Sequence, residues 1–192
     1  MQSGSTFHSK TDENGDLNQY WYSEKTCEIL CAAVKESMSL KTGGEGARVA
    51  FLSTPSLFFS LDEEDRKQCI LFDFDRSLSL GSCSSQFEFY DYNDPTNLDA
   101  ALHGKFDVIV IDPPFISQSV WKNYAITAAL LGVKDGAQFI CTTVEQNEEL
   151  MERLFKCKVM NFQPSIPKLI YQYNTYSNFQ SATLSTINPE LE

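Results

Sequence analysis

The feature of this sequence that most limits its fold is a series of short, strongly apolar runs separated by segments with helix or turn signals. Five such runs lie at residues 48–53, 69–75, 86–90, 106–111 and 137–143. Their length and their content of β-branched and aromatic residues are typical of buried strands. Strands that alternate with helices form a mostly parallel sheet with helices on both faces. The pattern therefore predicts an α/β fold built on a doubly wound sheet.

Helix signals occur between these runs. The predicted helices span residues 23–40, 54–66, 94–103, 117–131 and 144–155. Ser23 and Ser117 are candidate N-caps, because a serine hydroxyl can accept a hydrogen bond from the first helical turn. Pro55 and Pro95 suit the first helical position, where a backbone N–H has no intrahelical partner.

Two further apolar runs, 158–162 and 169–176, complete a predicted seven-stranded sheet. Pro164 and Pro167 interrupt the short connection between them, so no crossover helix fits there. The two runs are therefore predicted to pair in the antiparallel sense, which gives a mostly parallel sheet with an antiparallel last strand.

The chain length predicts a single domain. Residues 1–18 are polar and are expected to form a flexible leader, residues 19–176 the domain, and residues 177–192 a polar tail. No run of 18 apolar residues and no apolar secretion signal is present, so the protein is expected to have no membrane segment.

The charge balance argues against a polyanionic partner. The chain has 15 Lys and Arg against 26 Asp and Glu, a net charge of −11. Binding of nucleic acid requires a basic surface that neutralises phosphates, so a basic partner is favoured and nucleic acid is not.

Histidines and cysteines give no metal signature. The chain has only two histidines, and none of its six cysteines form a C-x-x-C pair. Both observations disfavour a zinc or iron site. We expect no metal, and buried free thiols in the reducing cytoplasm. The cysteines are Cys27, Cys31, Cys69, Cys83, Cys141 and Cys157.

In open α/β sheets, ligands bind beyond the carboxyl ends of the strands, so the residues that follow each run are the candidate site. The first run ends in Ser53 and Thr54 without the glycine-rich dinucleotide fingerprint. Their hydroxyls and amides suit a cofactor pocket, or Thr54 simply caps a helix. The second run ends with Asp73 and Asp75, of which Asp75 is the first choice for accepting hydrogen bonds from ribose hydroxyls. The alternative is that Asp75 is a turn residue paired with Arg76.

The third run ends at Asp91 and Tyr92. Asp91 can accept a hydrogen bond from an exocyclic adenine amino group, and a flanking aromatic ring such as Tyr92 can cover the base. The alternative is that Asp91 forms only an Asx turn or starts a helix.

The fourth run ends in Asp112, Pro113, Pro114 and Phe115, the most informative motif in the chain. Two prolines fix the backbone after a buried strand. The carboxylate and a prolyl carbonyl can accept from one amino group, with the Phe115 ring beside it. This arrangement suits alkylation of a nitrogen nucleophile; the alternative is a turn that only ends the strand.

Taken together, these residues resemble the class I S-adenosylmethionine-dependent methyltransferases of the Asp-Pro-Pro-aromatic type. They are most similar to the N6-adenine-methyltransferase-like branch, whose members methylate a lysine of translation elongation factor 1-alpha. The stretches that carry the resemblance are residues 19–23 (QYWYS), 49–56 (VAFLSTPS), 72–76 (FDFDR), 87–95 (FEFYDYNDP) and 106–115 (FDVIVIDPPF).

The resemblance implies a Rossmann-like methyltransferase that takes its methyl group from S-adenosyl-L-methionine and acts on a lysine of elongation factor 1-alpha, as a cytoplasmic monomer. It also implies that Tyr22 and Ser23 close over the cofactor, whereas the residues alone allow Tyr22 to be a hydrophobic staple of the first helix. Two alternatives remain open at this point. One is an adenine-N6 methyltransferase acting on DNA or RNA, and the other is a subunit that keeps the fold without catalysis.

Overall fold

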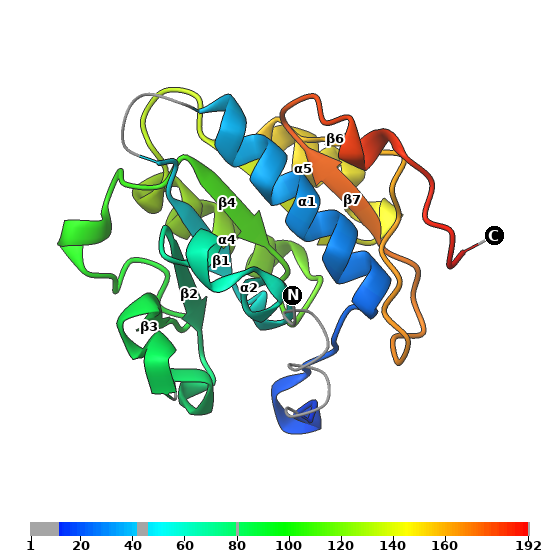
Figure 1. Cartoon of the computed structure of the whole chain (residues 1–192). Coiled ribbons are helices and arrows are strands. Elements are labelled where there is room, and N and C mark those ends of the chain that lie inside the picture. Colours follow the sequence, from blue (N-terminus) through cyan, green and yellow to red (C-terminus); the bar gives the residue numbers. More distant parts are fainter. Residues whose placement is uncertain (1–11, 42–45, 80, 192) are drawn as a thin grey trace.

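The computed structural model describes residues 12–41, 46–79 and 81–191, and its centre is a seven-stranded sheet with the order β3-β2-β1-β4-β5-β7-β6 (Figure 1). The strands are β1 (Val49–Leu52), β2 (Cys69–Asp73), β3 (Phe87–Phe89), β4 (Val108–Ile111), β5 (Gln138–Thr143), β6 (Lys158–Val159) and β7 (Asn174–Ser177). Only β7 runs against its neighbours, since it is antiparallel to both β5 and β6. The predicted mostly parallel sheet with an antiparallel last strand is confirmed.

The direction in which the chain builds the sheet changes between β1 and β4. From β1 the chain adds β2 and β3 on one side, and it then returns to place β4 and β5 on the other. The two central strands are in parallel register, with Leu52 beside Ile111. Their carboxyl ends therefore open at the same edge, which is where ligands bind in sheets of this kind.

Helices cover both faces of the sheet (Figure 1). They are α1 (Glu24–Leu40), α2 (Pro55–Ser60), α3 (Glu63–Arg66), α4 (Gln118–Leu131) and α5 (Glu148–Phe155). Successive residues of a strand point to opposite faces, so Phe51 packs in the core beneath α1 and α2, and Leu52 packs in the core beneath α4 and α5. In the part of the chain that the structure describes, no helix is long and apolar enough to cross a membrane.

The helix predicted at residues 94–103 is wrong. The connection from β3 to β4 consists of turns and a single 3-10 turn, Ala100–Leu102. Side chains compete with the helix for backbone donors there. Asp91 Oδ1 accepts from the Asn93 amide at 2.8 Å, and Asp99 Oδ1 accepts from the Ala101 amide at 2.9 Å. These local bonds stabilise turns, and the Asp-Pro pair at 94–95 lies within one of them.

The last two strands are shorter than predicted. The sequence predicts strands at 158–162 and 169–176, whereas β6 has two residues and β7 begins at Asn174. The residues between them form a loop that runs along the carboxyl edge of the sheet, and its Ile170 side chain is 86% exposed. The alternation of apolar residues in this loop therefore marks residues of the pocket and of the surface, and does not mark a strand.

The segment after β7 packs on α1. Leu184 is fully buried, and it lies in the same core cluster as the buried face of α1. Glu36 of α1 accepts hydrogen bonds from the Ser181 hydroxyl at 2.6 Å and from the Ala182 and Thr183 amides at 2.8 and 3.2 Å. Burial raises the pKa of Glu36, but these bonds outweigh it and leave the pKa lowered. The expected domain boundary at residue 176 thus falls inside β7, and the polar residues after it cover a helix.

Candidate active site

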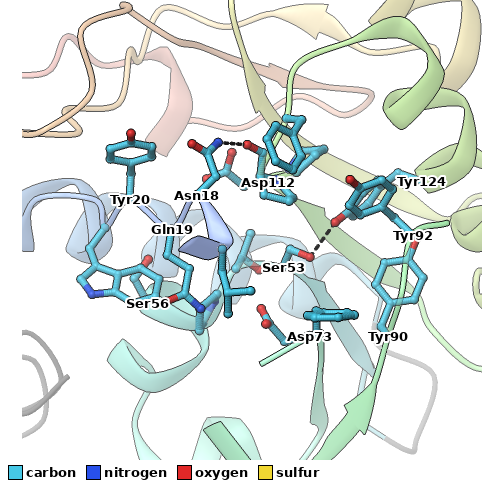
Figure 2. Close-up of a pocket in the computed structure, with 18 of the residues that line it drawn as sticks. Asn18, Gln19, Tyr20, Ser53, Ser56, Asp73, Tyr90, Tyr92, Asp112 and Tyr124 are labelled. Atoms are coloured by element: carbon cyan, nitrogen blue, oxygen red, sulfur yellow. Dashed lines mark hydrogen bonds between the residues drawn. The ribbon is translucent and has the colours of Figure 1, made fainter. Parts of the chain in front are cut away.

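A pocket lies at the carboxyl edge of the sheet, where β1 and β4 end side by side (Figure 2). Its volume is about 220 Å³. Residues from all parts of the chain line it: 16–21, 53–56, 73–74, 90–93 and 112–115, together with Tyr124, Ile166, Leu169 and Tyr173. Nine of the twelve site residues predicted from the sequence are in this set, which brings the ends of four strands together.

The turn after β1 has an unusual backbone. Ser53 has φ +55°, in the left-handed region that non-glycine residues rarely adopt. Its hydroxyl lies 2.6 Å from the Tyr124 hydroxyl, which ties the turn to α4. Thr54 is 2% exposed, and its hydroxyl makes no hydrogen bond, not even as a cap of α2. A buried hydroxyl without a partner on a pocket wall is an available donor or acceptor for a ligand.

Asp73, and not Asp75, faces the pocket after β2. Asp73 is 6% exposed, and burial raises its pKa to about 7 although one of its oxygens accepts from the Asp75 amide at 2.9 Å. Asp75 is absent from the lining; one of its oxygens accepts from the Ser77 amide and hydroxyl at 3.0 and 2.6 Å, and the other accepts from Gln19 at 3.1 Å. The Arg76 guanidinium lies over the Phe89 ring, 3.7 Å from its centre. Asp75 is therefore a turn residue, without the expected pairing to arginine.

At the end of β3, the two interpretations of Asp91 coexist. One oxygen of Asp91 accepts from the Asn93 amide in an Asx turn, and the residue also lines the pocket. Tyr92 stacks against Tyr124, with 6.0 Å between ring centres, and its ring lies 6.3 Å from that of Phe115. An aromatic wall therefore runs from the end of β3 to the end of β4.

Asp112 is held where β4 ends. Its carboxylate accepts hydrogen bonds from the side chains of Tyr22 and Thr142, and burial raises its pKa to about 7 against their influence. The Pro114 carbonyl accepts from the Asn18 side-chain amide, and the Phe115 ring is 47% exposed at the rim. Figure 2 shows Asp112 beside Asn18 at one end of the pocket and Asp73 at the other.

Tyr22 and Ser23 do not line the pocket. Tyr22 is 1% exposed, and its hydroxyl lies 2.5 Å from the Thr142 hydroxyl. Ser23 caps α1 by accepting from the Thr26 amide at 3.0 Å, and it donates to Glu190. Neither side chain covers the cavity, although both are neighbours of the segment that does.

Sequence reasoning missed the covering segment itself. Residues 16–18 were expected in a flexible leader, and residues 1–11 of that leader lie outside the described residues. A 3-10 turn, Gly15–Leu17, instead brings residues 16–21 onto the pocket, where Gln19 donates to Asp75 at 3.1 Å. An ion pair of 2.6 Å between Lys168 and Glu13 joins this segment to the loop before β7. The only local signal was Asn14, which caps the turn.

The pocket is an anionic cavity. Asp16, Asp73, Asp91 and Asp112 line it, and its described lining contains no lysine, arginine or histidine. Nor do the described residues contain any group of three or more His, Cys, Asp or Glu side chains that could hold a metal ion. Asp73 is buried and Asp112 is half-buried, and the described lining offers neither of them a cationic partner. Because burying a carboxylate without a counter-ion is costly, this arrangement suits a positively charged ligand.

Sequence comparison places the chain among known proteins. A family model described as "Probable N6-adenine methyltransferase" matches residues 13–181. The chain belongs to this family. It is 33% identical over 189 residues to "Protein-lysine N-methyltransferase M142.8" of Caenorhabditis elegans, covering 95% of this chain and 85% of the relative. It is 32% identical over 175 residues to "EEF1A lysine methyltransferase 1" of Gallus gallus, covering 88% and 77%.

A solved structure shares the fold at low sequence identity. Spermidine synthase from Thermotoga maritima superposes with a TM-score of 0.53 at 15% identity, over 88% of this chain and 66% of the other. This likeness supports the Rossmann-like architecture alone. The predicted membership of the N6-adenine-methyltransferase-like branch is confirmed by the family match and by the curated relatives.

Members of this family are methyltransferases that use S-adenosylmethionine, and the pocket of this N6-adenine-methyltransferase-like protein suits that cofactor. The unpartnered Thr54 hydroxyl lies in its wall, and the buried Asp73 offers the acceptor that a ribose diol requires. Tyr92 presents an aromatic ring next to Asp91, as adenine binding requires. The four carboxylates suit the positive charges of the sulfonium and the ammonium groups.

Proposed function

We propose that this protein transfers a methyl group from S-adenosylmethionine to the side-chain nitrogen of a lysine in translation elongation factor 1-alpha. The observation that carries the proposal is the anionic pocket, which has four carboxylates and no basic residue in its described lining. Both the methyl donor and a lysine are cations, whereas a nucleic acid is a polyanion. The names of the relatives from Caenorhabditis elegans and Gallus gallus favour the same reaction.

In this proposal the two ends of the pocket have different roles. Ser53, Thr54 and Asp73 hold the ribose and amino-acid part of the cofactor, and Asp91 and Tyr92 hold its adenine. The end formed by residues 112–115 receives the lysine. The rigid Pro113-Pro114 pair fixes the direction of the Asp112 carboxylate, and the exposed Phe115 ring forms the side of the entrance.

The reaction requires a neutral amine, because the lone pair of the nitrogen attacks the methyl carbon in line with the departing sulfur. The bound cofactor supplies an electrophilic methyl group on a sulfonium. At pH 7 only about one lysine in 2500 is neutral in water, so the site must help to remove a proton. Burial next to Tyr92, Phe115 and the cofactor's positive charge disfavours the ammonium. Asp112 accepts an N–H of the amine and points its lone pair at the methyl group.

The rim of the pocket suits a protein substrate. Ile170 is 86% exposed and Tyr171 is 57% exposed, directly after Leu169, which lines the pocket. Together with the half-exposed Phe115, these side chains place apolar surface beside the lysine end. Exposed apolar side chains that border a site are typical of protein-docking surfaces. A small free substrate would not need them.

The proposal is tested by incubating the purified protein with tritiated S-adenosylmethionine and purified elongation factor 1-alpha. We expect label in the factor, and mass spectrometry should place it on a lysine. The Asp112→Ala variant is the matched control and should give no label. A parallel reaction with DNA and RNA oligonucleotides tests the adenine-N6 alternative. Label in the oligonucleotides and none in the factor would overturn the proposal, and an unlabelled result throughout would favour the non-catalytic alternative.

We further propose that residues 12–191 act as one domain, in a monomer, in the cytoplasm. The five cysteines whose side chains the structure describes, Cys27, Cys31, Cys69, Cys141 and Cys157, are buried and unpaired, in keeping with a reducing compartment. Light scattering at micromolar concentration should give the mass of one chain, and cell fractionation should recover the protein with the cytosol. A dimer mass or recovery from an oxidising compartment would contradict this.

A further inference from the structure

The Tyr22 side chain lies at the carboxyl edge of the sheet, next to the pocket but not in its lining. It precedes the α1 N-cap, packs in the core beneath α1, and lies with its hydroxyl 2.5 Å from the Thr142 hydroxyl. Thr142 belongs to β5, and the parallel register that pairs Ile111 with Cys141 brings Asp112 level with Thr142. The Tyr22 and Thr142 hydroxyls therefore lie next to the Asp112 carboxylate, which receives the amine in the proposed reaction.

Both hydroxyls lie against that carboxylate, and Asp112 also lines the pocket. An ionised carboxylate can only accept hydrogen bonds, and each hydroxyl has one proton to donate. Because the two hydroxyls are also hydrogen-bonded to each other at 2.5 Å, one of their protons joins them and the other is donated to Asp112. Burial and the neighbouring Asp112 charge raise the pKa of Tyr22, so the phenol keeps its proton and the Tyr22–Thr142 pair remains a donor toward Asp112.

Among the residues that the structure describes, no positively charged group acts on the Asp112 carboxylate. The titratable groups that face Asp112 are Tyr22 before α1, Cys141 on β5, Tyr124 on α4 and Tyr173 before β7. Burial raises the pKa of each, so all four are neutral at pH 7. The influences that act on Asp112 are burial, which favours the protonated acid, and the two hydroxyls, which favour the carboxylate. Burial has the larger influence, and the hydroxyls reduce its effect, which leaves the pKa of Asp112 at about 7.

We propose that Tyr22 is a positioning residue of the methyl transfer: its hydroxyl, hydrogen-bonded to that of Thr142, holds the Asp112 carboxyl group directed at the incoming lysine nitrogen. This inference rests on the proposed function. It assigns Tyr22 a task different from the closure over the cofactor that the family resemblance implies. It also explains why a tyrosine that does not line the pocket is buried beneath the catalytic motif.

The inference is tested by the pH dependence of kcat/KM, which reports ionisations of the free enzyme. A lysine that must lose a proton gives a straight rise in log kcat/KM, and a second ionisation on Asp112 adds a bend near pH 7. In Tyr22→Phe the carboxylate loses a donor, so its pKa rises and the bend should move up by about one pH unit. At pH 7 activity should fall about fivefold, and near pH 9 it should recover to within about twofold.

Three variants serve as controls. Asp112→Asn should remove the bend and thereby identify its origin. Thr142→Val should move the bend in the same direction as Tyr22→Phe, and it carries the test if Tyr22→Phe does not fold. Tyr176→Phe removes another buried tyrosine hydroxyl, one that donates to the Val144 carbonyl at 3.4 Å and not to Asp112, and its bend should stay in place.

The outcomes separate this inference from the proposed function. If the unmodified protein labels no lysine, the proposed function fails. If it labels lysine but Tyr22→Phe keeps the bend where it was, the positioning role is wrong. Calorimetry with S-adenosylmethionine completes the test. A loss of cofactor affinity in Tyr22→Phe with an unmoved bend would return Tyr22 to the closure role.

Discussion

Replacing Asp112 with alanine should reduce methyl transfer at least about a hundredfold while leaving the affinity for S-adenosylmethionine within about threefold. The reason is that the Asp112 carboxylate lies at one end of the pocket, away from Asp73, and in the proposed mechanism it orients the amine without holding the cofactor. Asp112→Asn keeps a carbonyl acceptor of the same size. Because it lacks the charge, it should be less active than the unmodified protein, but the retained acceptor should leave it more active than the alanine variant.

Replacing Asp112 with asparagine should also make the folded protein more stable at pH 8. The pKa of Asp112 is about 7 in the folded protein, above the value near 3.9 of an unfolded chain. A group of this kind stabilises the fold fully at low pH, and that contribution is lost as the pH rises from about 4 to about 7. At pH 8 the unmodified protein should thus be less stable than Asp112→Asn by about 1–3 kcal/mol, and the difference should vanish near pH 4.

Thermal unfolding of the unmodified protein and of Asp112→Asn at several pH values measures the difference in stability. For Asp112→Ala, calorimetry measures the affinity for S-adenosylmethionine and the tritium assay measures the rate of methyl transfer. A melting temperature of Asp112→Asn several degrees higher at pH 8 is expected for a chain of this size. Unchanged turnover in Asp112→Ala would remove the residue from the mechanism. A lower melting temperature of Asp112→Asn at pH 8 would show that the carboxylate is compensated in the fold.

Replacing Asp73 with alanine should weaken binding of S-adenosylmethionine by about 10–100-fold, because two hydrogen bonds from ribose hydroxyls to a carboxylate would be lost. The matched control is Asp75→Ala, which removes a carboxylate two residues away that does not line the pocket and accepts from Ser77 and Gln19. Its affinity should stay within about threefold of the original. The sequence alone ranks Asp75 above Asp73 as the residue that binds the ribose, because Asp75 lies nearer the end of the strand. The structure places Asp73 in the pocket, and the two variants show which of these residues contacts the cofactor.

The pH dependence of binding gives a second readout for Asp73. Its pKa of about 7 means that the carboxylate which accepts from the ribose is fully formed only above neutral pH. Affinity should therefore rise between about pH 6 and pH 8 in the unmodified protein, and this part of the rise should be absent in Asp73→Ala. Isothermal titration with the same ligand on both proteins isolates the difference. Equal profiles would mean that Asp73 does not contact the cofactor.

Features that depend on neighbouring residues were predictable from the sequence. The strands of the parallel sheet, the helices that start at Ser23 and Ser117, and the turn at Asp112 follow from apolar runs, caps and prolines, all of which act locally. The pocket was predictable for a related reason. In a doubly wound sheet the strand ends meet at one edge, so residues far apart in the chain could be expected to lie together.

Features that depend on distant partners were not predictable. The segment at residues 16–20 is polar, and it is fixed only through contacts such as Asn18 with the Pro114 carbonyl. The choice between Asp73 and Asp75 depends on where the chain turns after β2. The turns at residues 94–103 include a backbone donor that a side chain satisfies, since Asp99 accepts from the Ala101 amide. Each outcome is decided by an interaction that periodicity does not encode.

Both ends of the described chain take part in the folded structure, and this restricts how the protein can be shortened. A fragment limited to residues 23–176 keeps nearly all of the sheet and every helix labelled α, so it looks like a reasonable minimal unit. It would nevertheless lack residues 16–21, which form a wall of the pocket, and Leu184, which covers part of α1. Such a fragment would present an open cofactor site and a bare apolar strip, and would be prone to aggregate before any activity could be assayed.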